Sequence, residues 1–490
     1  MISSSLKNTN TKKTSSCYEA IEPQKHSLVL EGKRFHFIGI GGVGTSGLAH
    51  LMIKNGVSVS GSDICSNPFL KNLKKAGAEI KIGHDPKNIS PLTDAVVITA
   101  AIKDDNPELV RAKEMGLKIY KYAQALGMVM DKYKSVAVSG THGKSTASAW
   151  LACCLREAAV DPNFIIGAQV SQLDCSASTG KSRLFIAEAC EYDRSFLSLK
   201  PNIGCILNIE ADHLDYYKDE DEIVRTFAEF ANAIKPGGSL IANGDDENVK
   251  KAIGLISDRI DVITFGLDKN CDFYASDTQL RDGLYSFDVF YKNNLLGRTK
   301  ISLAGRHNIL NALAVIAMAV NCGLDHQQAL DVIPSFTGIE RRLMFKDRIG
   351  DITIIDDYAH HPTEIRASLE AIQQLYNPKR LWCVFQPHQY SRTKFFLDDF
   401  AKSFNLADKV IIPEIYFVRD CPETKKIVNA KMLAQNISSH GTDAVNIDSF
   451  SGICEHLKKN VRPGDLVVTM GAGNIWKVAD EYIRWLRKNS

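Results

Sequence analysis

The chain has 490 residues, of which 44% are hydrophobic and 24% charged, and its formal net charge at pH 7 is +2. At roughly 100 to 200 residues per domain, this length predicts about three domains with sizeable cores. The balanced charge argues against nucleic acid as a partner. The sequence has no run of about 20 apolar residues, so we do not expect membrane insertion.

The first segment, residues 1–28, is rich in Ser, Thr, Lys and Asn and has no apolar centre of the kind found in signal peptides. We therefore expect a flexible tail that does not direct export. The twelve cysteines are scattered and form no C-x-x-C pair, which favours a reduced, cytoplasmic setting.

After the tail, short Val- and Ile-rich segments alternate with longer helical patterns, which predicts an α/β protein whose parallel sheets are covered by helices on both faces. Polar or Pro/Gly-containing stretches at 128–134 and 334–338 predict domains at 29–130, 131–335 and 336–490. The predicted strands are Arg34–Ile40, Val57–Gly61, Ala95–Thr99, Val136–Ser139, Leu184–Ala187, Ile203–Leu207, Thr353–Ile355, Leu381–Phe385, Lys409–Ile412 and Leu466–Thr469. Ligands of open α/β sheets bind outside the carboxyl ends of strands, so polar residues that follow these strands are site candidates.

The first unit opens with a glycine-rich turn between a strand and a helix. Gly39, Gly41 and Gly44 lie in this turn, and Asp63 ends the next strand. The glycines let the backbone approach a pyrophosphate, and the acid would hold a ribose hydroxyl. The pattern predicts a nucleotide diphosphate ligand, but NAD and a UDP-sugar would present the same anion.

A phosphate-binding loop follows the strand at 136–139, in the run SVAVSGTHGKSTASAW. Its backbone N–H groups and the helix start would surround phosphates, Lys144 would pair with the outer phosphates, and the Ser145 hydroxyl would reach Mg²⁺. The general nucleotide-hydrolase pattern has a glycine five places before Gly143, where this chain has Val138. GTHGKST is thus a tighter variant of the loop.

Acids and a histidine follow the next two strands of the central unit. Glu188 ends one strand, and the other is followed by Asn208, Glu210, Asp212, His213 and Asp215. A hard cation that bridges phosphates takes carboxylate, hydroxyl and occasionally imidazole ligands. We predict that Ser145, Glu188 and His213 hold Mg²⁺.

Further candidates lie toward the C-terminus. They are Asn308 and Asn311 on one face of a helix start, Arg341 and Arg342, the cluster Asp356, Asp357, Tyr358, His360 and His361 after a strand, His388 and Arg392, and the glycine turn within Leu466–Ile475. Asparagine amides match the edge of an adenine, an arginine can steady phosphoryl charge, and the cluster can receive a polar second substrate. The adjacent histidines lack the helical spacing or the cysteine partners of a zinc site, so we do not predict zinc from this pair.

Eight motifs, in this order over residues 30–480, resemble the Mur ligase family, and within it the members that join L-alanine to UDP-N-acetylmuramate. They are GIGGVGTSG, GTHGKST, EACEYD, NIEADHLD, GRHNILN, DDYAHHPTE, PHQYSRT and TMGAGNI. The resemblance implies a Rossmann-like domain for the UDP-sugar, a central P-loop ATPase-type domain and a C-terminal Rossmann-like domain for the amino acid. It also implies that ATP phosphorylates the lactyl carboxylate of UDP-N-acetylmuramate and that the amine of L-alanine attacks the acyl phosphate, with release of ADP and phosphate during peptidoglycan precursor synthesis.

The resemblance further implies roles for individual residues. UDP-sugar binding falls to Gly39, Gly41, Gly42, Gly44 and Asp63. ATP binding falls to Gly140, Thr141, His142, Gly143, Lys144, Ser145, Thr146, Asn308, Asn311, Arg342 and Asp357, and Mg²⁺ binding to Ser145, Glu188 and His213. Tyr358, His360 and Arg392 would frame alanine, and the catalytic set is Lys144, Glu188, His213 and Arg342. We expect a monomer or weak homodimer that is open without ligands and closed with them.

The sequence departs from the family pattern at four positions: Cys190 and Asn474 replace Asp, Tyr192 replaces Ser, and Gln389 replaces Arg. One alternative is a murein peptide ligase, which joins a recycled tripeptide to UDP-N-acetylmuramate and tends to have Phe at the position of Tyr358. A nicotinamide oxidoreductase would leave GTHGKST unexplained. A non-catalytic nucleotide sensor would be expected to have lost Lys144, Glu188 or His213, all of which are present.

Overall fold

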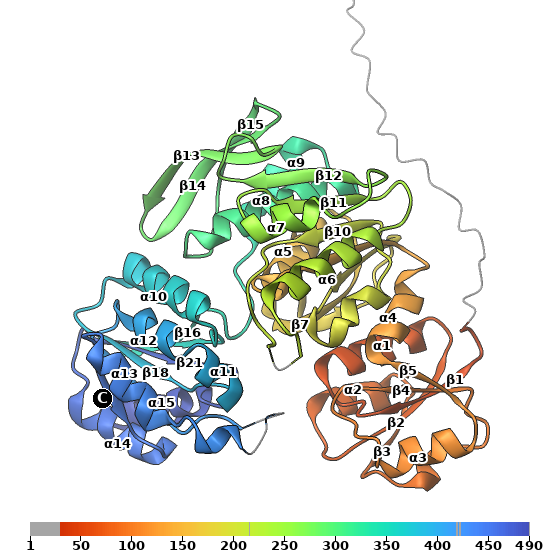
Figure 1. Cartoon of the computed structure of the whole chain (residues 1–490), viewed down its shortest axis with the longest axis horizontal. Coiled ribbons are helices and arrows are strands. Elements are labelled where there is room, and N and C mark those ends of the chain that lie inside the picture. The colour runs from red at the N-terminus through yellow and green to blue at the C-terminus, as the bar shows by residue number, and fades with distance from the viewer. Residues whose placement is uncertain (1–29, 215, 418–419, 421–422, 490) are drawn as a thin grey trace, which may run out of the picture.

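The computed structural model describes residues 30–214, 216–417, 420 and 423–489 (Figure 1). Three sheets follow one another along the chain, each with its own helices, and they appear in Figure 1 as the red, the yellow-to-green and the blue bodies. The α/β class with three domains is therefore confirmed. The predicted tail, 1–28, and Asp215 lie outside the described residues.

The first sheet is fully parallel, in the order β3-β2-β1-β4-β5. Its elements are β1 (Arg34–Ile38), α1 (Val43–Lys54), β2 (Ser58–Asp63), α2 (Pro68–Lys75), β3 (Glu79–Ile82), β4 (Ala95–Ile98), α3 (Pro107–Glu114), β5 (Lys118–Lys121) and α4 (Tyr122–Met130). Asparagine side chains cap two of the helices, since Asn67 accepts from Leu70 N and Asn106 from Glu108 N.

The central sheet has the order β15-β14-β13-β12-β11-β10-β6-β9-β7-β8 and is parallel from β13 to β7. Its strands are β6 (Lys134–Ser139), β7 (Asn163–Val170), β8 (Cys175–Ser178), β9 (Leu184–Glu188), β10 (Ile203–Ile206), β11 (Ser239–Asn243), β12 (Asp261–Gly266), β13 (Phe273–Arg281), β14 (Leu284–Tyr291) and β15 (Asn294–Lys300). Its helices are α5 (Lys144–Glu157), α6 (Glu220–Asn232), α7 (Glu247–Ile253), α8 (His307–Cys322) and α9 (His326–Val332), with a 3-10 segment, η3 (Tyr192–Ser198), after β9.

The third sheet has the order β16-β17-β21-β18-β19-β20, with β16 antiparallel and the other strands parallel. Its strands are β16 (Met344–Ile349), β17 (Ile352–Asp357), β18 (Leu381–Phe385), β19 (Lys409–Ile412), β20 (Asp443–Asn446) and β21 (Leu466–Met470). Its helices are α10 (Pro362–Tyr376), α11 (Tyr390–Phe395), α12 (Leu397–Ala401), α13 (Ala430–Ser439), α14 (Phe450–Asn460) and α15 (Trp476–Asn489).

All ten predicted strands are present, with ends that differ by at most two residues from those observed. The expectation of parallel sheets fails at β8 and β16, which pair antiparallel with β7 and β17, and in β13, β14 and β15, which form antiparallel hairpins. Two-residue turns join the hairpin strands, and both residues of each turn have positive φ, 51° and 75° at Asp282 and Gly283 and 47° and 64° at Lys292 and Asn293. Such turns match the twist of paired antiparallel strands.

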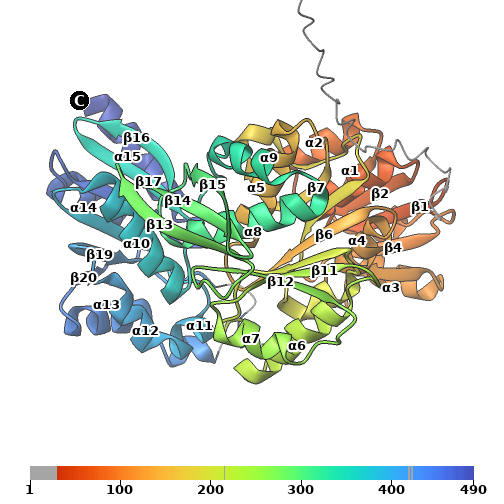
Figure 2. The ribbon, with the colours of Figure 1, turned by 90° about the horizontal axis from the view of Figure 1, so that it is seen from above.

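The β13–β14 hairpin also reaches the C-terminal domain. Figure 2 shows it beside α10, where the Tyr285 hydroxyl donates to Gln374 Oε1 at 3.2 Å. At the hairpin turn, a Cβ on Gly283 would lie 2.4 Å from the Cα of Leu375, so a glycine is needed there. The hairpin thus connects the central and C-terminal domains.

Apolar helix faces cover both sides of each sheet. On one face of the central sheet, α5 and α8 pack against β-strand residues such as Val136 and Val138, and on the other Phe227 and Phe230 of α6 cover Ile206. No helix among the described residues is both long enough and apolar enough to cross a membrane.

Trp150 is the largest fully buried side chain of the central domain. It lies on α5, its ring centre is 5.2 Å from that of Phe336, and its Nε1 donates to the Ile333 carbonyl at 3.1 Å. Trp150 thus anchors the end of the central domain to the helix that carries the phosphate loop.

We predict that Trp150→Ala lowers the free energy of unfolding by about 3 to 5 kcal/mol, because it leaves a large cavity and an unpaired carbonyl. Urea unfolding followed by circular dichroism measures the change. Trp476→Ala is the control, since Trp476 is 36% exposed and its loss should cost about 0.5 kcal/mol or less. Equal effects of the two substitutions would contradict this view of the core.

Candidate active site

The phosphate loop lies between β6 and α5, at the carboxyl edge of the central sheet. Gly140 and Gly143 have φ of 137° and 84°, which residues with a side chain rarely adopt, and Gly143 caps the N-terminus of α5. Asn208, which follows β10, holds the loop from the next strand. It accepts from His142 N at 2.7 Å and donates to the His142 carbonyl at 3.1 Å.

Lys144 is folded against its own loop. Its ammonium donates to the Gly140 carbonyl at 2.5 Å and to the Thr141 carbonyl at 3.1 Å, and it pairs with Glu191 at 2.9 Å. Burial opposes the charge, but the Glu191 carboxylate outweighs this effect and raises the pKa of Lys144. The loop therefore holds a fixed positive charge where an anion would bind.

The predicted magnesium ligands lie around this lysine. Burial raises the pKa of the Glu188 carboxyl, which accepts from Gly167 N at 2.6 Å and from the Ser145 hydroxyl. His213 is connected to the group through Glu191, whose carboxylate lies 3.6 Å from His213 Nε2. A partly buried carboxylate beside a hydroxyl is a donor set that suits a hard cation.

An interdomain cavity of about 500 Å³ lies between the central and C-terminal domains. Seven of the residues predicted to bind ATP line it: His142, Gly143, Thr146, Asn308, Asn311, Arg342 and Asp357. The two asparagines are linked, since Asn311 Nδ2 donates to Asn308 Oδ1 at 2.9 Å. Gly140, Thr141, Lys144 and Ser145 belong to the adjoining phosphate loop but do not line the cavity.

Glu364, on the first turn of α10, joins the two walls of this cavity. Its carboxylate accepts from Arg342 at 3.1 Å and from the backbone N–H of His360 at 3.0 Å, and it lies 3.3 Å from His142 Nδ1. Burial opposes its ionisation, but Arg342 and the two histidines hold the pKa of Glu364 well below its usual range. Three predicted site residues from two domains thus share one carboxylate.

A second contact between these domains is the buried ion pair of Asp212 and Arg392. Arg392 donates to Asp212 Oδ1 from Nε at 3.1 Å and from a terminal nitrogen at 2.8 Å, and its other terminal nitrogen lies 3.1 Å from His388 Nδ1. Both partners line a cavity of about 310 Å³ together with His213 and Gln389. The pair thus lies in one cavity with His213, so Arg392, predicted for the amino acid, is near one predicted metal ligand, whereas Tyr358 and His360 do not line this cavity.

The other two residues predicted for the amino acid lie beside the arginines. The guanidinium carbons of Arg341 and Arg342 lie 5.0 and 5.2 Å from the ring centre of Tyr358. The His360 ring meets that of Tyr358 edge-on at 5.4 Å, and burial raises the pKa of the neighbouring Asp357 carboxyl.

The glycine turn of the first domain separates two further cavities. Gly39, Gly41, Gly42 and Asp63 line one of about 790 Å³, and Gly42 and Gly44 line another of about 850 Å³ that reaches the central domain. Asp63 Oδ2 accepts from Gly41 N at 2.8 Å, so this acid also fixes the turn itself.

The four departures from the family pattern have different surroundings. Tyr192 packs its ring against His213 at 5.0 Å and lines the 850 Å³ cavity. Gln389 is buried, with a φ of 70° and its N–H bonded to the Tyr416 carbonyl. Cys190 precedes Glu191, and Asn474 accepts from Lys477 N. Nothing in the structure explains the substitutions at Cys190 and Asn474.

Sequence reasoning assigned no role to four residues that organise the site: Glu191, Asn208, Asp212 and Glu364. Each lies inside a motif that the sequence had singled out. The motifs do not indicate which residues these side chains contact, because the contacts join segments that are far apart in the chain.

A buried carboxylate lies behind the lining of the 790 Å³ cavity, next to His84. Glu108 of α3 is fully buried, accepts from the Ser62 hydroxyl at 2.5 Å and lies 3.3 Å from His36 Nε2. It also accepts from Asn88 Nδ2 at 2.5 Å and lies 3.6 Å from Nδ1 of His84, which lines the cavity. Burial opposes its ionisation, but the hydrogen bonds from His36, Ser62 and Asn88 lower the pKa of Glu108.

Family models cover most of the chain. Residues 34–134 match the Mur ligase family, catalytic domain, residues 138–319 the Mur ligase middle domain, and residues 341–473 the Mur ligase, glutamate ligase domain. The chain belongs to the Mur ligase family.

Named relatives are similar over nearly their whole length. A UDP-N-acetylmuramate–L-alanine ligase of Caldanaerobacter subterraneus is 43% identical, covering 93% of this chain and 98% of the relative, and one of Clostridium acetobutylicum is 42% identical, covering 92% and 97%. The structure of a UDP-N-acetylmuramate-alanine ligase from Thermotoga maritima has a TM-score of 0.77 at 26% identity, covering 93% of this chain and all of that one. A murein peptide ligase from Psychrobacter arcticus has a TM-score of 0.69 at 25% identity, covering 93% and 99%.

We predict that Glu108→Gln lowers the free energy of unfolding at pH 7 by about 3 kcal/mol, because the amide cannot replace a buried, hydrogen-bonded carboxylate. The folded-state pKa is lowered, so this stability is present above the unfolded pKa of about 4.3 and is lost as pH falls through the folded pKa. The difference between variant and wild type should stay constant from about pH 8 to 5 and shrink below about pH 4.

Urea unfolding across this pH range measures the difference, with the exposed Glu114→Gln on the same helix as control. A difference that vanishes between pH 7 and 6 would show that a histidine, and not the Glu108 carboxylate, governs the network.

Proposed function

We propose that this chain is an ATP-dependent ligase that joins L-alanine to the lactyl carboxylate of UDP-N-acetylmuramate, with formation of ADP and phosphate, in peptidoglycan precursor synthesis. The observation that carries the proposal is the 43% identity, over 93% of the chain, to a ligase named for these two substrates. We expect a cytoplasmic enzyme that acts as a monomer or weak homodimer.

The chemistry asks mainly for positioning and charge neutralisation. A carboxylate is a poor electrophile, so its oxygen first attacks the γ-phosphorus of ATP while the bond to the ADP oxygen breaks. The amine of alanine then attacks the acyl carbon, loses a proton, and the phosphate leaves with its oxygen. No covalent bond to the protein is needed.

The interdomain cavity supports this assignment for ATP. Lys144 would neutralise the γ-phosphate, Asn308 and Asn311 would meet the adenine edge, and Arg342 would stabilise phosphoryl charge in the transition state. Asp357 lies on the same wall and accepts from Leu343 N and Ala359 N at 2.6 and 2.7 Å. We propose that it orients the nucleotide from the C-terminal domain.

Magnesium fits the surroundings of the phosphate loop, because the partly buried Glu188 carboxylate already accepts from the Ser145 hydroxyl. Ser145, Glu188 and His213 would hold the ion. When bound, it would neutralise phosphate charge. We propose that Tyr192 keeps the His213 ring in place through their contact at 5.0 Å.

The two other substrates would enter from opposite sides. The glycine turn with Gly39, Gly41, Gly42, Gly44 and Asp63 would hold the UDP-sugar, whose carboxylate would reach the phosphate loop along the 850 Å³ cavity. Tyr358, His360 and Arg392 would frame alanine beside the metal ligands.

Phosphate release from ATP tests the proposal, in the presence of Mg²⁺ and UDP-N-acetylmuramate with L-alanine, with the tripeptide L-Ala-γ-D-Glu-diaminopimelate, or with neither. We expect release that depends on alanine and the mass of UDP-N-acetylmuramoyl-alanine as product. Release with the tripeptide alone would assign the protein to the murein peptide ligases, and release in no mixture would contradict a ligase.

We predict that Lys144→Ala reduces kcat/KM for ATP by about 10³-fold, because a preorganised charge on the transferring phosphoryl group is lost. The same coupled assay measures it, and Lys300→Ala, on the exposed strand β15, serves as control. A Lys144→Ala enzyme within about tenfold of wild type would remove this residue from the catalytic set.

A further inference from the structure

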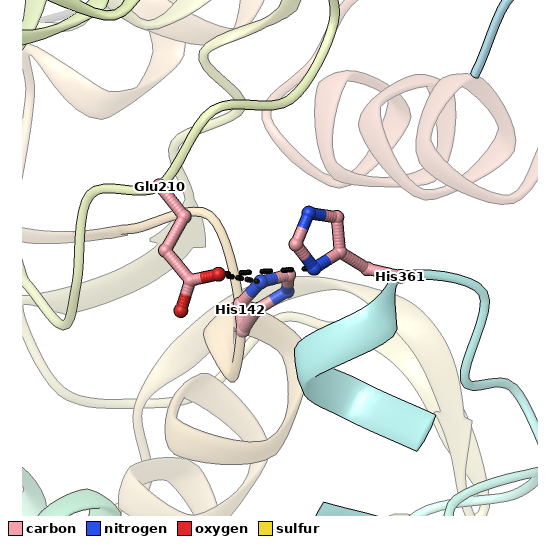
Figure 3. Close-up of side chains that lie close together, drawn as sticks. All are labelled: His142, Glu210 and His361. Atoms are coloured by element: carbon pink, nitrogen blue, oxygen red, sulfur yellow. Dashed lines mark ion pairs between the residues drawn. The ribbon is translucent and has the colours of Figure 1, made fainter. Parts of the chain in front are cut away.

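Three side chains from distant segments meet at the boundary between the central and C-terminal domains. They are His142 of the phosphate loop, Glu210 after β10, and His361 at the start of α10 (Figure 3). One ligand atom of each lies within 4.8 Å of the other two, and they form the one such group of three or more His, Cys, Asp or Glu residues in the described part of the chain. The predicted magnesium ligands, Ser145, Glu188 and His213, are different residues.

Each of the two histidines has an acceptor beside one of its ring nitrogens. If that nitrogen carries the proton and donates it to the acceptor, the other ring nitrogen is unprotonated and faces Glu210. His142 Nδ1 lies 3.3 Å from Glu364 Oε1, and His361 Nε2 lies 3.3 Å from the Ala211 carbonyl. This arrangement leaves His142 Nε2 and His361 Nδ1 at 3.5 and 3.7 Å from Glu210 Oε2. Histidines that bind metals have the same outer partners, a carboxylate or a backbone carbonyl on the second nitrogen.

The two histidines of the site are largely shielded from solvent, the Glu210 side chain is 34% exposed, and one histidine nitrogen is unsatisfied. The side chains of His142 and His361 are 14% and 4% exposed, and His142 Nε2 is a buried nitrogen with no hydrogen-bond partner among the described residues. The Glu210 carboxylate is itself oriented, because the Thr363 hydroxyl donates to its Oε2 at 2.7 Å. The competing contact at His361 Nδ1 is a long hydrogen bond of 3.3 Å from Thr363 N.

We propose that His142, Glu210 and His361 bind a divalent transition-metal ion, with Zn²⁺ as the best match, at a site separate from that of the magnesium ion. Two imidazoles and one carboxylate are a known zinc ligand set, whereas Mg²⁺ prefers oxygen ligands. His142 and Glu210 also line the interdomain cavity, so a water or a phosphate oxygen can supply a fourth ligand. The ion would link the central domain to the C-terminal domain next to the cavity proposed for ATP.

Without a metal, a proton is the competing occupant. Burial opposes a charge on His142, but Glu210 and Glu364 outweigh it and raise the pKa of His142 to about 9. Metal binding must displace this proton, so affinity should rise with pH.

The test is Zn²⁺ binding to the full-length protein, stripped with a chelator, at about pH 8 with excess Mg²⁺, by competition with a chromophoric chelator. We expect one equivalent bound in the wild type. Loss of a ligand in Glu210→Gln or His361→Gln should weaken binding by about 100-fold or more, and Thr363→Val, which removes a hydrogen bond to Glu210, by about tenfold. Co²⁺ should give the absorption of a tetrahedral site in the wild type and lose it in the ligand variants.

His440→Gln is the matched control, because His440 is an exposed histidine of the C-terminal domain whose hydrogen-bond partners, Ser439 and Asn436, lie on the helix that it caps, α13. It should bind Zn²⁺ like the wild type, and circular dichroism should show all variants folded. Ten cysteines in the described residues are free thiols, so Zn²⁺ could also bind elsewhere. Equal affinity and an unchanged Co²⁺ spectrum in Glu210→Gln and His361→Gln would overturn the proposal, as would the absence of binding in the wild type.

Discussion

The buried ion pair between Asp212 and Arg392 is the interaction on which the assembled site depends. Asp212 follows β10 of the central sheet, Arg392 lies on α11 of the C-terminal domain, and their side chains are 9% and 6% exposed. A buried charge without its partner is unfavourable. The ion pair therefore stabilises the arrangement in which the two domains are in contact. Glu364 extends the same interface to the nucleotide side, where it joins Arg342 to His142.

This arrangement explains why the chemistry can do without a covalent intermediate on the protein. The phosphate loop contributes a fixed positive charge at Lys144, the C-terminal domain contributes Arg342, and the cavity between them takes its walls from both domains. Electrostatic stabilisation is strongest where such groups are oriented before the reaction begins. We propose that the contacts between the domains also hold the catalytic groups in position before the reaction, and that domain movement controls access to the site.

The α/β class, three domains and ten strands could be predicted from the sequence, because alternating apolar segments report burial directly. The hairpins of β13 to β15 were missed, although Asp282 and Gly283 form a turn pair typical of hairpins. The site motifs could also be found in the sequence, since they follow parallel strands whose carboxyl ends meet at one edge of the sheet. Ion pairs such as that of Asp212 with Arg392 could not be predicted, because two partners about 180 residues apart produce no local sequence pattern.

The affinity for a non-hydrolysable ATP analogue, measured by calorimetry with Mg²⁺, tests most directly whether domain contact builds the nucleotide site. Arg392 does not line the interdomain cavity, so Arg392→Ala weakens the docking of the domains without removing a side chain from the nucleotide cavity. We expect affinity to fall by at least about tenfold, whereas Arg380→Ala, which breaks an ion pair with Asp465 inside the C-terminal domain, should leave it unchanged. Wild-type affinity in a folded Arg392→Ala protein would contradict the account.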